Sequence, residues 1–277
     1  MKTAIITGAD GDMGKQHTIA LAQDGFNIIM ACYCRQDGDK TCQEIKKLTH
    51  NEQIQVIELD LSSFDKIKLF VEKVKQTFNH VDVLLNNAGT LPSKPMVSAN
   101  GYELTIAVNY LGHFLLTELL SPLFVSQTRI VSMVSLTYKY GKIKENLFLP
   151  TEKYNRFVSY SNSKLALYYA TLYWADKWKD KNIHVNCADP GLVSTHIIKM
   201  DNVIVDTLCN ILFRPLIKTP LQGASTMIHV ATTNDGNVSG QLFKNKKIVK
   251  VKRKIANNFH QQQLLINMTE KVLENYL

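Results

Sequence analysis

A tyrosine and a lysine four residues apart form the pair in this sequence that is best suited to proton transfer. Tyr160 and Lys164 begin a long stretch of helical spacing, so a helix would place both side chains on one face. A free tyrosine has a pKa of about 10, but a nearby ammonium favours the phenolate and lowers that pKa. The pair predicts an acid–base centre, in which the hydroxyl of Ser135 would hold a substrate oxygen. Alone, this spacing is also common on ordinary surface helices.

A glycine-rich turn near the start of the chain predicts a phosphate-binding loop. Gly8, Gly11 and Gly14 follow a short apolar run and precede a helical pattern. Glycines let the backbone approach a pyrophosphate, and the helix N-terminus offers N–H groups and the positive end of its dipole. By itself the pattern also fits a tight strand–helix turn. Asp12 stands inside it and would put a carboxylate in or beside the phosphate site.

The elements that must position these groups alternate along the chain. Short apolar runs predict strands, and the stretches between them carry apolar residues at helical spacing, as in residues 15–23 and 64–78. Apolar strands separated by amphipathic helices indicate an α/β fold, a single-domain doubly wound parallel sheet (Rossmann-like). The predicted strands lie at residues 4–6, 27–30, 54–57, 81–85, 129–131 and 183–186.

Composition places the chain among ordinary globular proteins. It has 277 residues, of which 45% are hydrophobic and 20% charged, and this excludes a disordered chain, a collagen-like fibre and a disulfide-rich miniprotein. The net charge of +8 falls mainly on residues 244–277, which hold 8 Lys or Arg and 2 Asp or Glu. The body is therefore not built to hold nucleic acid. We divide the chain into residues 1–243, the catalytic domain, and a basic C-terminal extension, 244–277, packed on the same domain.

The basic extension has two interpretations. Basic and apolar residues alternate around Ile248–Lys252, and this pattern predicts a solvated edge strand protected by lysines. The same charge would also be attracted to an acidic membrane surface or a polyanion. Residues from about 261 to 276 are predicted to form a closing helix.

Cysteines, histidines and the N-terminal segment give mostly negative expectations. The five cysteines are odd in number and match no CxxC spacing, so we expect reduced thiols and a cytoplasmic protein. Cys32 and Cys34 are predicted to be core thiols rather than a redox pair. The eight histidines show no metal-ligand spacing, so no metal site is expected. We see no targeting segment and no apolar run of about 18 residues that would cross a membrane.

Taken together and in order, the motifs resemble those of the short-chain dehydrogenase/reductase family, over about residues 1–243. They are the glycine-rich turn, Asn86–Gly89, the Tyr160–Lys164 pair and Pro190-Gly191. Within the family the chain looks most like the retinol-dehydrogenase-like branch. The resemblance implies a catalytic tetrad: Tyr160 transfers the proton, Lys164 tunes it and binds the nicotinamide ribose, Ser135 polarises the carbonyl and Asn109 holds a relay water. Ser132 is the alternative to Ser135.

The resemblance also implies the cofactor contacts. The adenosine side would lie against Asn87, Ala88 and Gly89, and Asp60 would accept from the adenine amino group, although Asp60 also fits a turn or helix N-cap. Thr195 would reach the nicotinamide amide. The remaining expected contacts are Gly8, Gly11, Asp12, Met13, Gly14, Tyr160, Lys164, Pro190, Gly191 and Val193.

Two departures from the family pattern bear on the cofactor. Asp12 replaces the middle glycine of the loop, so either the loop uses Gly11 instead or the carboxylate turns outward. After the second strand, NAD enzymes of such folds place an acid for the ribose hydroxyls, and here none precedes Asp37. Tyr33 stands where the branch usually has Arg. Arg35, two residues later, would meet a 2′-phosphate, so the sequence favours NADP(H), with NAD(H) as the alternative.

The resulting prediction is an NADP(H)-dependent carbonyl reductase or alcohol dehydrogenase. Residues 192–219 are rich in apolar side chains, which fits either a lipophilic small-molecule substrate or plain core packing. One rival hypothesis, suggested by Asp12, is a nucleotide-binding regulator with little turnover. A second rival, suggested only by the tail, is a protein that associates with a membrane surface or polyanion. A homo-oligomer is compatible with the sequence.

Overall fold

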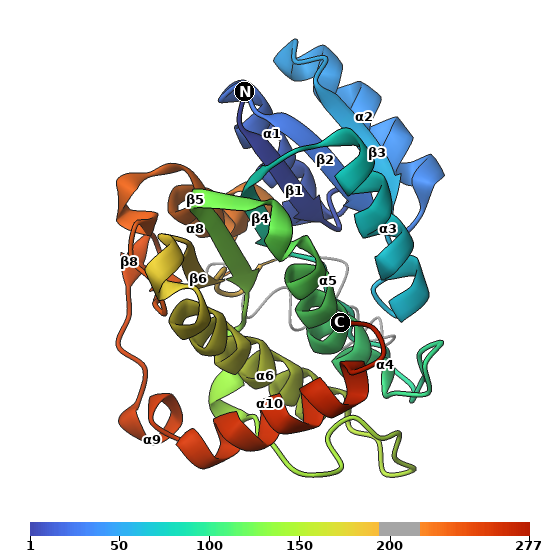
Figure 1. Cartoon of the computed structure of the whole chain (residues 1–277), viewed down its shortest axis with the longest axis vertical. Helices are drawn as coiled ribbons and strands as arrows, with labels where there is room; N and C mark the ends of the chain where they lie inside the picture. Colours follow the sequence, from blue (N-terminus) through green and yellow to red (C-terminus); the bar gives the residue numbers. More distant parts are fainter. Residues whose placement is uncertain (194–216) are drawn as a thin grey trace.

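The structure, a computed structural model, describes residues 1–193 and 217–277. Its centre is an eight-stranded sheet in the order β3-β2-β1-β4-β5-β6-β7-β8, in which every neighbouring pair is parallel except β7 and β8 (Figure 1). All six predicted strands are present. The strands are β1 (Thr3–Thr7), β2 (Asn27–Cys32), β3 (Ile54–Glu58), β4 (Val81–Asn86), β5 (Phe124–Met133), β6 (His184–Asp189), β7 (Leu242–Lys244) and β8 (Lys247–Ile248).

Helices cover both faces of this sheet, which confirms the doubly wound fold. One layer holds α1, α2 and α8, and the other holds α3, α5 and α6 with α10 packed outside α6 (Figure 1). The helices are α1 (Asp12–Gln23), α2 (Arg35–Thr49), α3 (Phe64–Thr77), α4 (Leu104–Ile106), α5 (Gly112–Leu120), α6 (Arg156–Lys177), α8 (Pro220–Thr232), α9 (Arg253–Ala256) and α10 (Phe259–Leu273). Successive side chains of β1 point to opposite faces of the sheet, so Ile5 packs in the hydrophobic cluster on one face and Ala4 and Ile6 pack in the cluster on the other.

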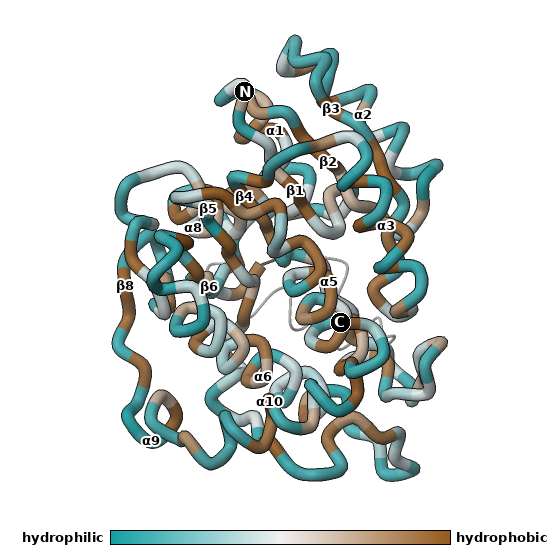
Figure 2. The backbone as a smooth tube through the Cα atoms, in the orientation of Figure 1, coloured by the Kyte–Doolittle hydropathy of each residue, from teal (hydrophilic) through white to brown (hydrophobic). Residues whose placement is uncertain are grey.

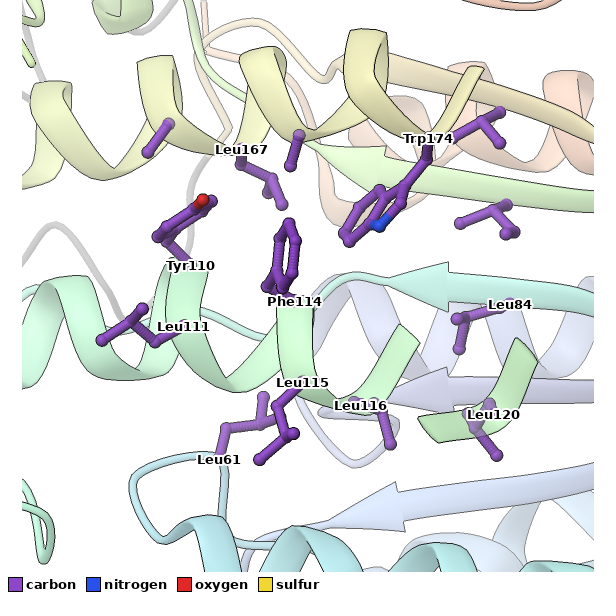
Figure 3. Close-up of a cluster of buried hydrophobic side chains, with 14 of the residues drawn as sticks. Leu61, Leu84, Tyr110, Leu111, Phe114, Leu115, Leu116, Leu120, Leu167 and Trp174 are labelled. Carbon is purple, nitrogen blue, oxygen red and sulfur yellow. The ribbon is translucent and has the colours of Figure 1, made fainter. Parts of the chain in front are cut away.

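The layer that carries the tyrosine helix is anchored by aromatic packing. Phe114 of α5 lies between Tyr110 and Trp174, with ring centroids 5.9 and 5.3 Å away, and all three side chains are buried (Figure 3). Burying one such side chain stabilises a fold by about 1.5–3 kcal/mol. This contact fixes α6 against α5. It therefore holds the N-terminal half of α6, where Tyr160 and Lys164 lie, in a constant position relative to the strand ends.

The same layer contains the one stretch of the described residues that is long and apolar enough to cross a membrane. Leu104–Leu123 meets that criterion, but 72% of it is buried inside the protein, where it forms the packing core around α5. Figure 2 shows the hydrophobic segments concentrated in the central strands and the core helices, while the outer helix α2 is largely hydrophilic.

The C-terminal extension packs on the domain and differs in part from the prediction. The expected strand over Ile248–Lys252 is wrong beyond its first residue, because the ladder of β8 covers only Lys247–Ile248 and α9 begins at Arg253. The turn between β7 and β8 consists of two residues with positive φ, Asn245 at 50° and Lys246 at 63°, which suits a tight hairpin. The predicted closing helix is α10, and its Thr269 hydroxyl contacts the Tyr110 hydroxyl at 2.7 Å.

Candidate active site

The glycine-rich loop joins β1 to α1 and is shaped by two glycines. Gly8 has a φ of +61°, and its N–H donates to the Ala31 carbonyl at 2.8 Å. A side chain at Gly14 would place its Cβ 2.0 Å from the Gly8 carbonyl oxygen, so the first turn of α1 packs onto the loop only with glycine there. Gly11 is the N-cap, and a Cβ at this position would meet only the Gly8 carbonyl oxygen, at 3.4 Å. The packing within the loop therefore requires glycine at Gly8 and Gly14, while the use of Gly11 for the approach of a phosphate stays a prediction.

This loop forms one wall of a cavity of about 640 Å³ at the carboxyl ends of β1, β2 and β4. In open α/β sheets, ligands bind at this edge. The cavity is lined by Gly8, Asp10, Gly11, Asp12, Met13, Gly14, Ala31, Tyr33, Leu59, Asp60, Leu61, Ser62, Asn87, Ala88, Gly89, Thr90, Leu104 and Val108. Three of these described residues carry carboxylates and none is Lys or Arg. The wall is therefore acidic, and Asp12 is one of the residues that line it.

A threonine that was not predicted as a site residue organises the opposite wall. The Thr7 hydroxyl accepts from the backbone N–H groups of Asn87 and Ala88, each at 2.9 Å. It also lies 3.0 Å from Nε2 of the buried His113. The Asn87 amide in turn donates to the Thr7 carbonyl at 2.8 Å. Thr7 immediately precedes Gly8, so position in the motif is the only sequence feature that could have singled it out.

Asp60 closes a turn, as one interpretation of the sequence predicted, and its contact with the adenine amino group stays a prediction. Its Oδ1 accepts from the N–H of Ser62 at 2.8 Å and from the Ser62 hydroxyl at 2.6 Å, so it closes the turn after β3. The same residue lines the cavity. The turn fixes the carboxylate in place, and this is compatible with a contact to a bound ligand.

The proton-transfer group is assembled behind Gly89, at the junction of β5 and α6. The Ser135 hydroxyl is hydrogen-bonded to Tyr160, and the Lys164 ammonium lies 5.4 Å from the centroid of the Tyr160 ring. Lys164 is buried and donates to the Met133 carbonyl at 2.8 Å. The predicted helical pairing of Tyr160 with Lys164 is thus present. Ser132, the alternative to Ser135, points into the sheet core with its hydroxyl unpaired among the described residues.

The expected pKa of the tyrosine differs from the sequence argument. Burial is the main cause that raises the pKa of Tyr160 to about 12; the Ser135 hydrogen bond partly opposes it, and the charge of Asp189 adds to it. The net lowering predicted from Lys164 is not seen, because burial outweighs it; the ammonium donates to the Met133 carbonyl and lies 5.4 Å from the centroid of the Tyr160 ring. Burial also lowers the pKa of Lys164 to about 8. At neutral pH the site therefore holds a protonated phenol beside an ammonium, which suits proton donation.

Asn109 joins three elements around this site. It lies in a π-helical turn, Ala107–Leu111, a distortion that is frequent at functional positions. Its Oδ1 accepts from the Thr90 N–H at 2.7 Å, while its amide donates to the Thr90 carbonyl at 3.0 Å and to the Ser163 hydroxyl at 3.1 Å. Asn109 thus ties the loop after β4 to the tyrosine helix. Its predicted part in holding a water stays a prediction.

Gly89 lies between the cavity and the proton-transfer group, and its surroundings bear on whether a dinucleotide fits. A Cβ on Gly89 would lie 3.4 Å from Oδ1 of Asn109 and 3.7 Å from Nζ of Lys164. The missing side chain leaves a cradle at the point where both groups reach the cavity wall. With the glycine loop, the N-terminus of α1 and a volume in the usual range for ligand sites, these residues fit a nicotinamide dinucleotide by shape.

The turn after β6 flanks the same region. Gly191 has a φ of +83°, and its N–H donates to Oδ1 of the buried Asp189 at 2.9 Å. Val193 packs on Gly223 of α8, where a Cβ would lie 2.6 Å from its Cγ2 and 3.2 Å from Sδ of Met13. Val193 is thereby brought close to Met13 of the glycine loop, while Gly191 packs against Lys218. Thr195 and most of the predicted substrate region, residues 194–216, lie outside the described residues.

Arg35 is not brought to the cavity. It begins α2, is exposed, and its Nε lies 3.4 Å from Oδ2 of Asp39, whereas Tyr33 lines the cavity.

Of Cys32 and Cys34, which were both predicted to be core thiols, only Cys32 lies in the core. Cys32 is buried, and burial raises its pKa, while Cys34, the N-cap residue of α2, is half-buried. Among the described residues, no group of three or more His, Cys, Asp or Glu could hold a metal ion.

Comparison with known proteins identifies the family. The short chain dehydrogenase family matches residues 2–203. The chain belongs to the short chain dehydrogenase family. Human retinol dehydrogenase 14 is 33% identical over 260 residues, covering 87% of this chain and 77% of the relative. Human retinol dehydrogenase 12 is 32% identical over 262 residues, covering 93% and 82%. These relatives place the chain in the retinol-dehydrogenase-like branch, as an oxidoreductase that acts on CH–OH or carbonyl groups.

Solved structures share the fold. A protein from Mycobacterium paratuberculosis superposes with a TM-score of 0.79 at 24% identity, over 99% of this chain and 94% of that one. An NADP active-site complex of Pseudomonas aeruginosa RhlG gives a TM-score of 0.71 at 18% identity, over 88% of this chain and 94% of that one. At these identities the likeness concerns the fold.

Proposed function

We propose that this short chain dehydrogenase transfers hydride between a nicotinamide dinucleotide and a lipophilic carbonyl or alcohol. The observation that carries the proposal is the convergence of Tyr160, Ser135 and Lys164 behind the Gly89 cradle, at the edge of the dinucleotide-shaped cavity. A lipophilic substrate is supported by three exposed apolar side chains that are close in sequence to Ser135, Tyr160 and Gly191, namely Leu136, Phe157 and Leu192.

The chain's own residues perform the acid–base half of the reaction. When bound, the nicotinamide supplies or accepts the hydride. In the reducing direction the Ser135 hydroxyl donates to the carbonyl oxygen, and the Tyr160 phenol gives its proton to that oxygen as the alcohol forms. The Lys164 ammonium stabilises the phenolate that is left. Asn109 holds Thr90 and Ser163 so that the cradle and the tyrosine helix stay aligned.

The choice of dinucleotide is a separate proposal, based on Arg35. The ion pair of Arg35 with Asp39 is exposed, and such pairs contribute only about 0–1 kcal/mol, so the guanidinium can leave it for a 2′-phosphate at little cost. On this basis we retain NADP(H) as the proposed cofactor. The acidic wall of Asp10, Asp12 and Asp60 opposes any phosphate. If Arg35 selects NADP(H), Arg35→Ala weakens NADPH binding and leaves NADH binding unchanged. If the variant binds NADPH as tightly as the unaltered protein does, Arg35 does not select NADP(H).

The experiment that tests the activity follows NADPH and NADH oxidation with a panel of hydrophobic aldehydes and ketones, and a matched panel of short polar carbonyls. Turnover confined to the hydrophobic panel supports the proposal. Cofactor binding by calorimetry without turnover on either panel would favour the rival hypothesis of a nucleotide-binding regulator. Reduced cysteines support a cytoplasmic location as a further proposal.

A further inference from the structure

Two lysines bind the turn after β6 to the C-terminal hairpin. Nζ of Lys218 donates to the Pro190 carbonyl at 3.0 Å and to Oδ1 of Asn245 at 2.7 Å. Asn245 is the first residue of the tight turn between β7 and β8. Lys218 therefore spans from the site turn to the hairpin, and its side chain also packs against Gly191.

The second lysine reaches the carboxylate inside this turn. Asp189 is the last residue of β6 and pairs in register with Lys244 of β7. Only 3% of its side chain is exposed, and its two oxygens are divided between two partners. Oδ1 accepts from the Gly191 N–H at 2.9 Å, and Oδ2 lies 3.5 Å from Nζ of Lys244. A buried carboxylate needs such a cation, because an uncompensated buried charge is strongly destabilising.

We propose that Asp189 and Lys244 are a positioning pair of the active site, through which the basic extension fixes the Pro190–Gly191 turn and sets the charge that the Tyr160 hydroxyl experiences. This inference rests on the proposed function. It gives one lysine of the basic extension a part in the site, in contrast to the exposed lysines of the same hairpin.

The charged groups around the phenol support this assignment. Lys164 faces the Tyr160 ring from the same helix, Ser135 binds its hydroxyl from the end of β5, and Asp189 acts from the end of β6. Burial is the largest cause of the raised pKa values of Tyr160, Cys187 and Tyr138, and the charge of Asp189 adds to all three, so these groups lie within reach of its carboxylate. Lys244, facing Asp189 from β7, offsets that charge.

The pair makes a prediction that a purely structural ion pair does not make. Asp189→Asn keeps an acceptor for the Gly191 N–H and removes the negative charge, so the Tyr160 pKa falls. Lys244→Gln removes the compensating cation and leaves the negative charge, so the Tyr160 pKa rises. Each change should alter the ionisation constant of Tyr160 by about threefold to tenfold, in opposite directions. Lys247→Gln, an equal charge loss on the exposed part of the hairpin, is the matched control and should leave it unchanged.

The test reads the phenol directly and does not require turnover. The full-length protein is labelled with ¹³Cζ-tyrosine, Tyr160→Phe identifies the signal, and the phenolate fraction is compared at a fixed pH of about 10.5. The pH profile of kcat/KM is then measured for the same variants. Opposite shifts in Asp189→Asn and Lys244→Gln support the pair. Shifts in one direction, or none, overturn it, whatever happens to thermal stability. If no carbonyl is turned over, the proposed function fails while the phenol titration still decides this inference.

Discussion

The two ends of the site are built on different principles. The dinucleotide end is an open loop whose shape depends on Gly8 and Gly14 and whose wall carries three carboxylates. The catalytic end is buried, and each polar group there has a specific partner, such as the Met133 carbonyl for Lys164. Shape therefore matters most where the cofactor phosphates would lie, and charge placement matters most where the proton moves. Substitutions that separate binding from chemistry can test this division.

The largest effect is expected at Lys164, which serves both ends. Lys164→Ala removes the ammonium that stabilises the phenolate and that also reaches the Gly89 cradle. We expect turnover to fall by at least about 100-fold, in the range typical of acid–base catalysis, together with a loss of cofactor affinity. Lys177→Ala, at the other end of α6, is the control. Steady-state kinetics with calorimetry checks both quantities, and a loss of turnover at unchanged affinity would remove Lys164 from the binding end.

Gly14 and Gly11 of the same loop test whether cofactor binding depends on the tight packing of the loop. Gly14→Ala would force a Cβ to within 2.0 Å of the Gly8 carbonyl oxygen, so the loop must open and cofactor affinity should fall at least about tenfold. Gly11→Ala would place its Cβ in ordinary contact at 3.4 Å and should bind almost normally. Calorimetric titration compares the two. If Gly11→Ala lost more cofactor affinity than Gly14→Ala, the backbone would approach the pyrophosphate at Gly11, which is the alternative that the sequence left open.

Asp12 tests the charge of the same end. A carboxylate about 4 Å from a phosphate charge costs roughly 4 kcal/mol at an effective dielectric constant near 20, and less where water screens it. Asp12→Gly should therefore tighten dinucleotide binding by about tenfold, with the gap narrowing as salt rises. Asp12→Asn keeps the side-chain volume and should recover most of the gain. Titration at two salt concentrations measures this, and unchanged affinity in both variants would mean that the carboxylate exerts no penalty.

A separate effect concerns the stability of the protein rather than its activity, and it arises in α1, next to the glycine loop. His17 of α1 is fully buried, and burial lowers its pKa from 6.5 to about 3, despite a contact with the Ala224 backbone. Between these two values the unfolded chain binds the extra proton, so stability is complete above about pH 6.5 and is lost as pH falls toward 3. This histidine should remove about 2 kcal/mol between pH 7 and pH 5. Urea unfolding at pH 7 and pH 5 measures the loss. In His17→Leu the free energy of unfolding should fall by about 2 kcal/mol less between these pH values, whereas His260→Leu, which changes an exposed histidine, should behave like the unaltered protein.

Much of the fold was predictable because local pattern and global structure agree. The six strand predictions rest on apolar runs, and the pairing of Tyr160 with Lys164 rests on helical spacing. The pKa direction of Tyr160 was not predictable, since it depends on burial and on Asp189, a residue that only the sheet brings near. The same holds for Thr7 with Ala88, and for Asp189 with Lys244, whose partners lie more than 50 residues apart. The short length of β8 was not predicted, because basic and apolar residues continue to alternate after Ile248, where the pairing with β7 ends.

The measurement that tests the central claim most directly is a comparison of turnover and cofactor binding in Tyr160→Phe. The substitution removes the phenol hydroxyl and leaves the ring to pack beside Lys164. The account predicts that kcat with the best hydrophobic carbonyl falls by about 10²–10⁴-fold, while the calorimetric Kd for the dinucleotide stays within about twofold. Turnover close to that of the unaltered protein, with the same Kd, would contradict the assignment of Tyr160 as the proton-transfer group.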